Sequence, residues 1–202
     1  MDKIVLSELD GLRFEENGHR YVLRGTDIPS VSQIMAPLSH IEYKDIDKSI
    51  LDKAAKRGTG IHNCIENYIK YGVRDFDPEY QGYANGFMEW WNQNNPEVIG
   101  SEYRVYHSVL MYAGTIDLLA YINGELCLID YKTTYRLIDK NCRVQLEGYS
   151  QALKTHGVEV QRKHILHLQK DGKWQFPEYP AKDHEALRTF MALKTVYDYV
   201  KS

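Results

Sequence analysis

Cysteine is scarce in this sequence, and its few copies form no recognisable pair. The three cysteines are Cys64, Cys127 and Cys142, and no Cys-x-x-Cys motif occurs. Three scattered thiols cannot supply a four-cysteine iron–sulfur cluster. Cys64 and Cys127 occupy apolar positions, so we expect both to pack as small core residues. This cysteine usage fits a reducing cytosol, and we expect a cytoplasmic protein.

Long apolar runs, internal repeats and low-complexity tracts are also lacking. No signal peptide, basic transit segment or transmembrane run is visible, so we expect no membrane partner. No glycine-rich phosphate loop of the nucleotide-binding kind occurs. The apolar and charged fractions are ordinary for a globular domain of this length.

Excess positive charge is missing as well. The formal net charge is −3, which is not the electrostatic footprint of a protein that coats nucleic acid. The 16 tyrosines do not distinguish a nucleic-acid-binding protein from other classes, because tyrosine can pack in a core, stack on bases or contact phosphate. Any surface that binds nucleic acid must therefore be a local basic patch. Its candidate residues are Lys53, Lys56, Arg57, Arg136, Lys140 and Arg143.

Hydrophobic periodicity and turn signals predict an order of helices and strands that is typical of an α/β domain. Asn17-Gly18 and Asn123-Gly124 are strong hairpin signals, Ser30 is a predicted helix N-cap, and Gly58-Thr59-Gly60 could interrupt a long helix. The expected strands are 12–16, 19–23, 98–107, 115–122, 125–131, 158–169 and 174–179. The expected helices are 31–35, 44–71, 80–94, 143–155 and 182–200. We expect one domain over 1–202, with an N-terminal hairpin and lead-in segment at 1–45 and a core at 46–202.

The second hairpin carries the most informative charges. Side chains alternate along a strand, so Asp130 and Lys132 share one face while Tyr131 points to the other. Counting outward from the Asn123-Gly124 turn places Asp117 almost opposite this end of the second strand. Two carboxylates and one ammonium therefore converge within a largely apolar ribbon, where charges need partners, a metal or solvent.

A hard divalent cation would relieve the repulsion between the two carboxylates. Oxygen ligands favour Mg²⁺ or Mn²⁺ over zinc or copper. Lys132 could orient or help deprotonate a water, and it could offset the charge on a phosphate oxygen. The unit is typical of metal-assisted phosphodiester hydrolysis, although a surface hairpin with a chance Asp-x-Lys would contain the same tripeptide.

These residues resemble a known superfamily once the flanking motifs are added. Asp117, a hairpin, the run 129–133 and a helix with Gln145-x-x-x-Tyr149 together resemble the PD-(D/E)xK nucleases. The Gln-x-x-x-Tyr motif is similar to that of the RecB-like exonuclease branch. Gly-Thr-Ile-Asp before the hairpin and Lys-Thr-Thr after it also resemble phage exonucleases and the mitochondrial genome-maintenance exonuclease. One departure is Ile116, where the superfamily often has proline.

The resemblance implies a restriction-endonuclease-like fold, with a central mixed β-sheet flanked by helices, and it implies further site residues. The run 57–62 is similar to the Gly-x-x-x-His motif, whose histidine, here His62, reaches the metal or lines the site. Glu102, on the strand before the hairpin, is the candidate for another acidic ligand. Glu66 shares a helical face with His62. Its side chain could contact the substrate, remain a solvated carboxylate or be the partner of His62.

The expected site combines all of these residues. The expected metal ligands are His62, Glu102, Asp117, Asp130 and the Tyr131 carbonyl. The expected catalytic residues are Asp117, Asp130, Lys132, Gln145 and Tyr149. The expected substrate contacts are Glu66, Thr133, Gln145 and Tyr149.

The implied activity is Mg²⁺- or Mn²⁺-dependent hydrolysis of DNA by an exonuclease, on single strands or duplex ends, in phage or bacterial recombination, repair or processing. A structure-specific endonuclease on the same site is one alternative. A catalytically silent DNA-binding or partner-binding module is another. DNA is the expected partner, and the sequence leaves open a homo-oligomer or a recombination partner. The expected location is the cytosol of a bacterium or of a phage-infected host.

Overall fold

The computed structural model of the protein describes residues 4–6 and 8–201, so the predicted domain ends at 1 and 202 lie outside the described residues. A central mixed sheet runs in the order β4-β5-β6-β7-β8, with β9 paired to β7. Its strands are β4 (Glu97–His107), β5 (Tyr112–Ile122), β6 (Glu125–Lys132), β7 (Arg162–Leu168), β8 (Trp174–Gln175) and β9 (Glu178–Tyr179). The predicted fold class, a mixed sheet flanked by helices, is confirmed.

The sheet is antiparallel on one side and turns parallel in its middle. β4, β5 and β6 are consecutive antiparallel strands. Asn123 and Gly124 make the tight β5–β6 turn with φ values of 53° and 81°, as the hairpin signal predicts. β6 and β7 are parallel, so the chain must cross over between them, and α5 (Asp139–Lys154) is that crossover.

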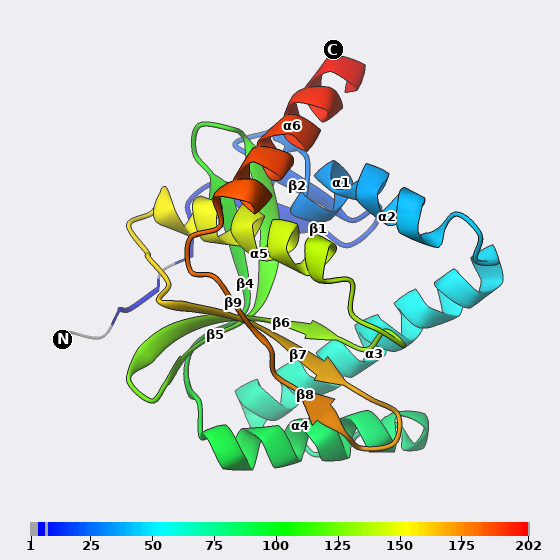
Figure 1. The fold of residues 1–202 in the computed structure, drawn as a ribbon. Coiled ribbons are helices and arrows are strands. Elements are labelled where there is room, and N and C mark those ends of the chain that lie inside the picture. Colours follow the sequence, from blue (N-terminus) through cyan, green and yellow to red (C-terminus); the bar gives the residue numbers. More distant parts are fainter. Residues whose placement is uncertain (1–3, 7, 202) are drawn as a thin grey trace.

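Helices cover both faces of the sheet (Figure 1). Besides α5 they are α1 (Val31–Ile34), α3 (Lys48–Tyr71), α4 (Gln81–Asn94) and α6 (His184–Lys201). Leu119 and Leu128 pack in the core beneath α5 and α6, whereas Leu118 and Ile129 pack in the core beneath α3 and α4. Within residues 4–6 and 8–201, no helix combines the length and the apolar character that a bilayer crossing needs.

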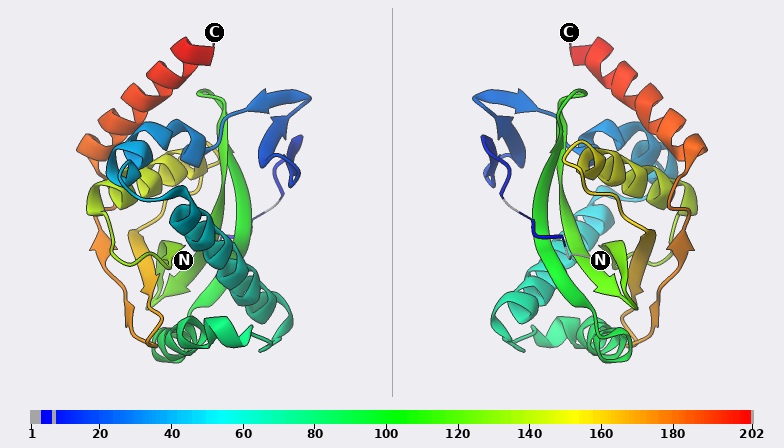
Figure 2. Two further views of the ribbon diagram at one scale, coloured as in Figure 1. Left: turned by 90° about the vertical axis from the view of Figure 1, so that its right-hand side faces the viewer. Right: turned by 90° about the vertical axis from the view of Figure 1, so that its left-hand side faces the viewer.

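The predicted N-terminal hairpin is present and has a third strand. The strands of this separate antiparallel sheet are β1 (Leu12–Glu15), β2 (Arg20–Leu23) and β3 (Thr26–Ile28). Figure 2 shows the small sheet beside the long β4–β5 ribbon. Its first turn is wider than predicted, because pairing closes at Glu15 and Arg20, while Gly18 and His19 take φ values of 90° and 48°.

The capping prediction for the first helix is confirmed. The Ser30 hydroxyl accepts from the Gln33 amide at 3.0 Å, and the Gln33 side chain accepts from the Ser30 amide at 2.9 Å. This reciprocal capping box fixes the start of α1. A further helix that was not predicted, α2 (Ala36–Tyr43), leads to α3.

Several predicted elements differ from the structure; for example, the predicted strand 174–179 is divided into β8 and β9, and α3 begins at Lys48 rather than at 44. α3 continues through Gly58-Thr59-Gly60 without the possible interruption. Gly60 instead allows close packing, since a Cβ there would lie 2.6 Å from the Tyr80 ring. α5 begins at Asp139 rather than at 143, which shortens the predicted loop. β7 begins at Arg162 rather than at 158, because Val158 and Val160 pack on the core from an unpaired segment.

Candidate metal centre

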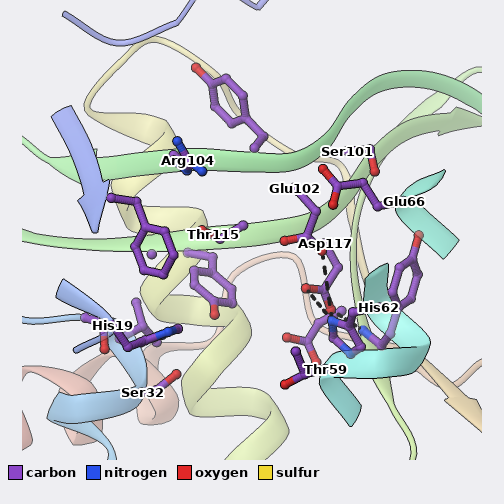
Figure 3. A pocket seen from close by; sticks show the side chains of 18 of the residues that line it. His19, Ser32, Thr59, His62, Glu66, Ser101, Glu102, Arg104, Thr115 and Asp117 are labelled. Atoms are coloured by element: carbon purple, nitrogen blue, oxygen red, sulfur yellow. Dashed lines mark hydrogen bonds and ion pairs between the residues drawn. The ribbon is translucent and has the colours of Figure 1, made fainter. Parts of the chain in front are cut away.

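Three of the predicted site residues meet over the β4–β5 ribbon (Figure 3). The Nδ1 atom of His62 lies 3.3 Å from Oδ1 of Asp117 and 4.0 Å from Oε1 of Glu102. One ligand atom from each residue lies within 4.8 Å of the other two. In the described part of the chain, this is the one group of three or more metal-ligating side chains gathered so closely.

Each of the three residues comes from a different element. His62 projects from α3, Glu102 from β4 and Asp117 from β5. Ser101 of β4 pairs with Leu118 of β5, and Tyr103 pairs with Ile116. Glu102 therefore stands opposite Asp117. Glu102 has a φ of 50°, a left-handed conformation that non-glycine residues rarely adopt. Strain of this kind persists where the surroundings enforce it, and it clusters at functional sites.

Asp130 and Lys132 lie beside this cluster. An ion pair joins Lys132 to Oδ2 of Asp130, and Gln145 donates a hydrogen bond of 2.9 Å to Oδ1. Gln145 also donates to the Tyr149 hydroxyl at 3.2 Å, so both residues share the predicted face of α5. Asp130 is not one of the three clustered residues, and its predicted role as a direct ligand stays a prediction.

Tyr131 contacts the two ligands through its amide and its ring. The amide donates a hydrogen bond of 2.6 Å to Oδ2 of Asp117. The ring packs edge-on against His62, with centroids 5.5 Å apart and an interplanar angle of 76°. These contacts orient Asp117 and His62, and ligation by the Tyr131 carbonyl stays a prediction.

The remaining predicted contacts divide between the site and the surface. Thr133 is buried, and its carbonyl accepts from Arg57 at 3.2 Å. Glu66 lies beside the cluster and forms an ion pair with Lys70, while its predicted contact with the substrate stays a prediction. The predicted basic patch loses Arg143, because Asp183 binds its guanidinium at 2.6 Å.

Burial and crowding of like charges shift the pKa values of the site. Burial and then the nearby Asp117 charge raise the pKa of Glu102 to about 8. Burial raises the pKa of Asp130 to about 6, although Lys132 opposes it. Burial would lower the pKa of His62, but the Asp117 carboxylate outweighs it and raises that pKa to about 9. Burial would raise the pKa of Asp117, but His62 and Lys132 hold it below its ordinary value.

The donor set fits a divalent cation. Two carboxylates and one imidazole converge from three elements, and oxygen-rich sites of this kind suit Mg²⁺ or Mn²⁺. Burial and the neighbouring Asp117 charge both disfavour the charged form of Glu102, and a bound cation would favour it. His62, Glu102 and Asp117 are therefore the residues that would hold the ion, with Asp130 directly beside them.

A cavity of about 1000 Å³ opens over the cluster and extends to the N-terminal sheet. Phe14, His19, Tyr21 and Arg104 line its far end, and sequence reasoning missed all four. One signal could have found Arg104, since it follows Glu102 by two residues and alternate residues of a strand share a face. The other three lie far from the acidic hairpin in sequence, and no pattern in the sequence connects them to it.

No protein-family model matches the chain, and no curated protein matches it. Among solved structures, the protein SSO0001 is similar over 72% of this chain and 75% of its own, with 16% sequence identity and a TM-score of 0.37. Similarity at this level carries no argument, so the function must be argued from the residues and their geometry.

Proposed function

We propose that this protein is a Mg²⁺- or Mn²⁺-dependent deoxyribonuclease of the PD-(D/E)xK kind that acts as an exonuclease. One observation carries the proposal: the ligand atoms of His62, Glu102 and Asp117 gather within 4.8 Å, and the Asp130–Lys132 ion pair lies beside them. The residues that resemble the superfamily's motifs are thus neighbours in the fold. A chain with this activity would work in the cytosol of a bacterium or of a phage-infected cell, with DNA as its partner.

When bound, Mg²⁺ or Mn²⁺ would supply a water of lowered pKa and would offset charge on the scissile phosphate. The chain's own residues supply the positioning. The Tyr131 amide holds Oδ2 of Asp117, while Oδ1 lies on the His62 side. Gln145 and Tyr149 form a hydrogen-bonded chain that steadies Asp130. These contacts orient the site acids before any substrate arrives.

Lys132 acts as a cation in this mechanism. Burial would lower its pKa, but the charges of Asp130 and Asp117 outweigh burial and raise that pKa. A protonated lysine donates hydrogen bonds and cannot accept a proton, so it would orient the water and stabilise phosphate oxygens in the transition state. The proton released by the water would pass to Asp130, a carboxylate of raised pKa outside the three-ligand cluster.

Digestion of linear DNA labelled separately at each end, with Mg²⁺ or Mn²⁺ and with a chelator control, tests the proposal. Asp117→Asn and Lys132→Ala should lower the rate at least about a hundredfold while circular dichroism stays that of the wild type. The chain offers a matched control in Asp171-Gly172-Lys173, which has the same spacing and an ion pair of 2.7 Å in an exposed turn. Lys173→Ala should leave the rate unchanged.

Two results would reject the assignment: no metal-dependent cleavage by the wild type, or a Lys132→Ala variant as active as Lys173→Ala. A circular single-stranded substrate separates the exonuclease from the structure-specific endonuclease, because an exonuclease leaves the circle intact. Tight DNA binding without hydrolysis would instead identify a catalytically silent module.

A further inference from the structure

The cavity over the metal centre continues to a second group of side chains. This far end is lined by Phe14 of β1, His19 of the β1–β2 turn, Tyr21 of β2 and Arg104 of β4. Figure 3 shows His19 and Arg104 on the far side of Thr115 from Asp117. We call Phe14, His19 and Arg104 the aromatic platform, and nothing in the mechanism above uses it.

The β4–β5 ribbon sets the distance between the two ends. Arg104 on β4 pairs with Thr115 on β5. This pair lies two residues along each strand from Glu102 and Asp117, so the two cross-strand pairs are neighbours on one face of the ribbon. The Tyr21 hydroxyl lies 2.8 Å from Oγ1 of Thr115, and this hydrogen bond joins the N-terminal sheet to the Arg104–Thr115 pair. Two strand residues span roughly 7 Å, which is on the order of one nucleotide of an extended strand.

The platform has the chemistry of a base-stacking site. The Arg104 guanidinium lies 5.3 Å from the centroid of the Phe14 ring. The His19 ring meets Phe14 edge-on, with centroids 4.9 Å apart, and Tyr21 supports Phe14 from within the sheet at 4.9 Å. His19 and Arg104 are exposed, and Phe14 is half-buried. Aromatic rings and arginine planes in a cavity are the groups on which unpaired bases stack.

The cavity carries acids as well as the Arg104 cation. Glu8 and Glu16 also line the cavity, and their carboxylates repel a phosphate but not an uncharged base. A base inside a duplex has both faces covered and its edge paired, so it cannot reach such a platform without leaving the stack. The platform therefore selects an unpaired base.

We propose that the aromatic platform of Phe14, His19 and Arg104 is a subsite for an unpaired nucleobase about one nucleotide from the scissile phosphate. The N-terminal sheet is then part of the substrate cleft, and single-stranded DNA is the substrate class. This inference rests on the proposed nuclease function, and it assigns specificity to residues that take no part in the metal centre.

Binding without cleavage tests the subsite. The probe is a fluorescein-labelled single-stranded oligonucleotide, and its anisotropy is measured with Ca²⁺ in place of Mg²⁺. Arg104→Gln removes the charge, and His19→Asn removes the ring while asparagine tolerates the left-handed backbone. Each should weaken the Kd about tenfold. His19→Phe, which keeps a ring, should bind within about twofold of the wild type.

Arg13→Gln is the matched control, because Arg13 is exposed and alternates with Phe14 on the opposite face of β1. Equal Kd values for Arg104→Gln, His19→Asn and Arg13→Gln would overturn the subsite, as would a wild type that binds a duplex of the same sequence more tightly than the single strand. Failure of the proposed function has a different signature, since the wild type would then show no Mg²⁺- or Mn²⁺-dependent cleavage whatever the anisotropy shows.

Discussion

Glu102 combines a largely buried carboxylate with a left-handed backbone in the middle of β4. That conformation costs on the order of 1–3 kcal/mol for a residue other than glycine. The raised pKa, about 8, means that the charged side chain is also disfavoured where it lies. Both costs fall on one residue next to Asp117, which is the pattern expected of a residue retained for a ligand rather than for folding.

Replacing Glu102 should separate stability from metal binding. Glu102→Gly relieves the backbone strain and the buried charge, so the free energy of unfolding in chelator should rise by about 1 kcal/mol. The same variant should bind Mn²⁺ at least about tenfold more weakly in calorimetric titrations. Glu102→Gln keeps the backbone strain and isolates the effect of the charge. A Glu102→Gly variant less stable than the wild type in chelator would contradict this account of the strain.

Gly114 makes room for a side chain of the site. The structure places the Tyr149 ring against this glycine. A Cβ at position 114 would lie 2.5 Å from Cε1 of Tyr149. The glycine therefore lets Tyr149 reach Gln145, which in turn holds Asp130.

Gly114→Ala should push the Tyr149 ring away and disturb the Gln145–Asp130 link. We expect a loss of about 1–3 kcal/mol in stability and a lower kcat in DNA digestion. Gly124→Ala is the control, because its φ of 81° makes alanine strained while nothing lies within 4 Å. That variant should lose stability but keep its activity per folded molecule. Full activity and stability in Gly114→Ala would contradict this account, because the Tyr149 ring would then be able to move aside without disturbing Gln145.

At the scale of elements, α5 connects the site to the rest of the fold. It carries Gln145 to the site, and Glu147 of the same helix forms a buried ion pair with Lys163 of β7. Arg143 binds both carboxylate oxygens of Asp183, at 2.6 and 2.9 Å. Asp183 also caps α6, since it accepts from the Ala186 amide at 3.0 Å. The start of α6 is thus fastened to the start of α5.

The Arg143–Asp183 pair predicts a pH dependence of stability. Hydrogen bonds from Arg143 lower the pKa of Asp183 to about 2, so the pair stabilises the fold above pH 4 and loses this contribution as pH falls toward 2. Asp183→Asn keeps a good N-cap but removes the charge. It should cost about 1–2 kcal/mol at pH 6, a figure reduced for the partial exposure of Arg143.

Urea unfolding of the wild type and of Asp183→Asn between pH 2 and 7 checks this prediction. The difference in unfolding free energy should be constant above pH 4 and should shrink toward pH 2. Glu185→Gln is the control, because the exposed Glu185 binds the same guanidinium at 2.9 Å and should contribute under about 0.5 kcal/mol. A difference that does not change with pH would contradict the assignment to the Asp183 charge.

At the scale of the whole molecule, the candidate metal centre joins separate layers. His62 belongs to a helix on one face of the sheet, while Glu102 and Asp117 belong to the sheet itself. A cation bound by all three residues would therefore link the helix to the sheet. Ligands that bind only the native state raise its stability in proportion to the logarithm of their concentration.

Mn²⁺ at about a hundred times its Kd should stabilise the wild type by about 2.7 kcal/mol. For a chain of this length that corresponds to a rise in Tm of about 5–10 °C. Asp117→Asn should lose this rise, whereas Asp171→Asn, in an exposed turn, should keep it. Differential scanning calorimetry with and without Mn²⁺ makes the comparison, and equal shifts in both variants would place the ion elsewhere.

The sequence by itself determined the local pieces of this protein. Alternation and the Asn123-Gly124 turn predicted the acidic hairpin and put Asp117 beside Asp130, because strand pairing is set by turn geometry over a few residues. A four-residue spacing likewise predicted that Gln145 and Tyr149 share a helical face. Such features depend on short-range periodicity, which the chain carries along its own length.

The tertiary structure alone decided what those pieces touch. Asp-x-Lys occurs at Asp130–Lys132 and again at Asp171–Lys173, and in both the lysine pairs with its aspartate. In the first pair Asp130 is buried and Lys132 half-buried, close to a helix and a second acid, while the other pair is exposed in a turn. The aromatic platform and the α3 histidine reach the hairpin only through packing of distant segments. Charge chemistry depends on burial and on neighbours, and long-range packing sets both.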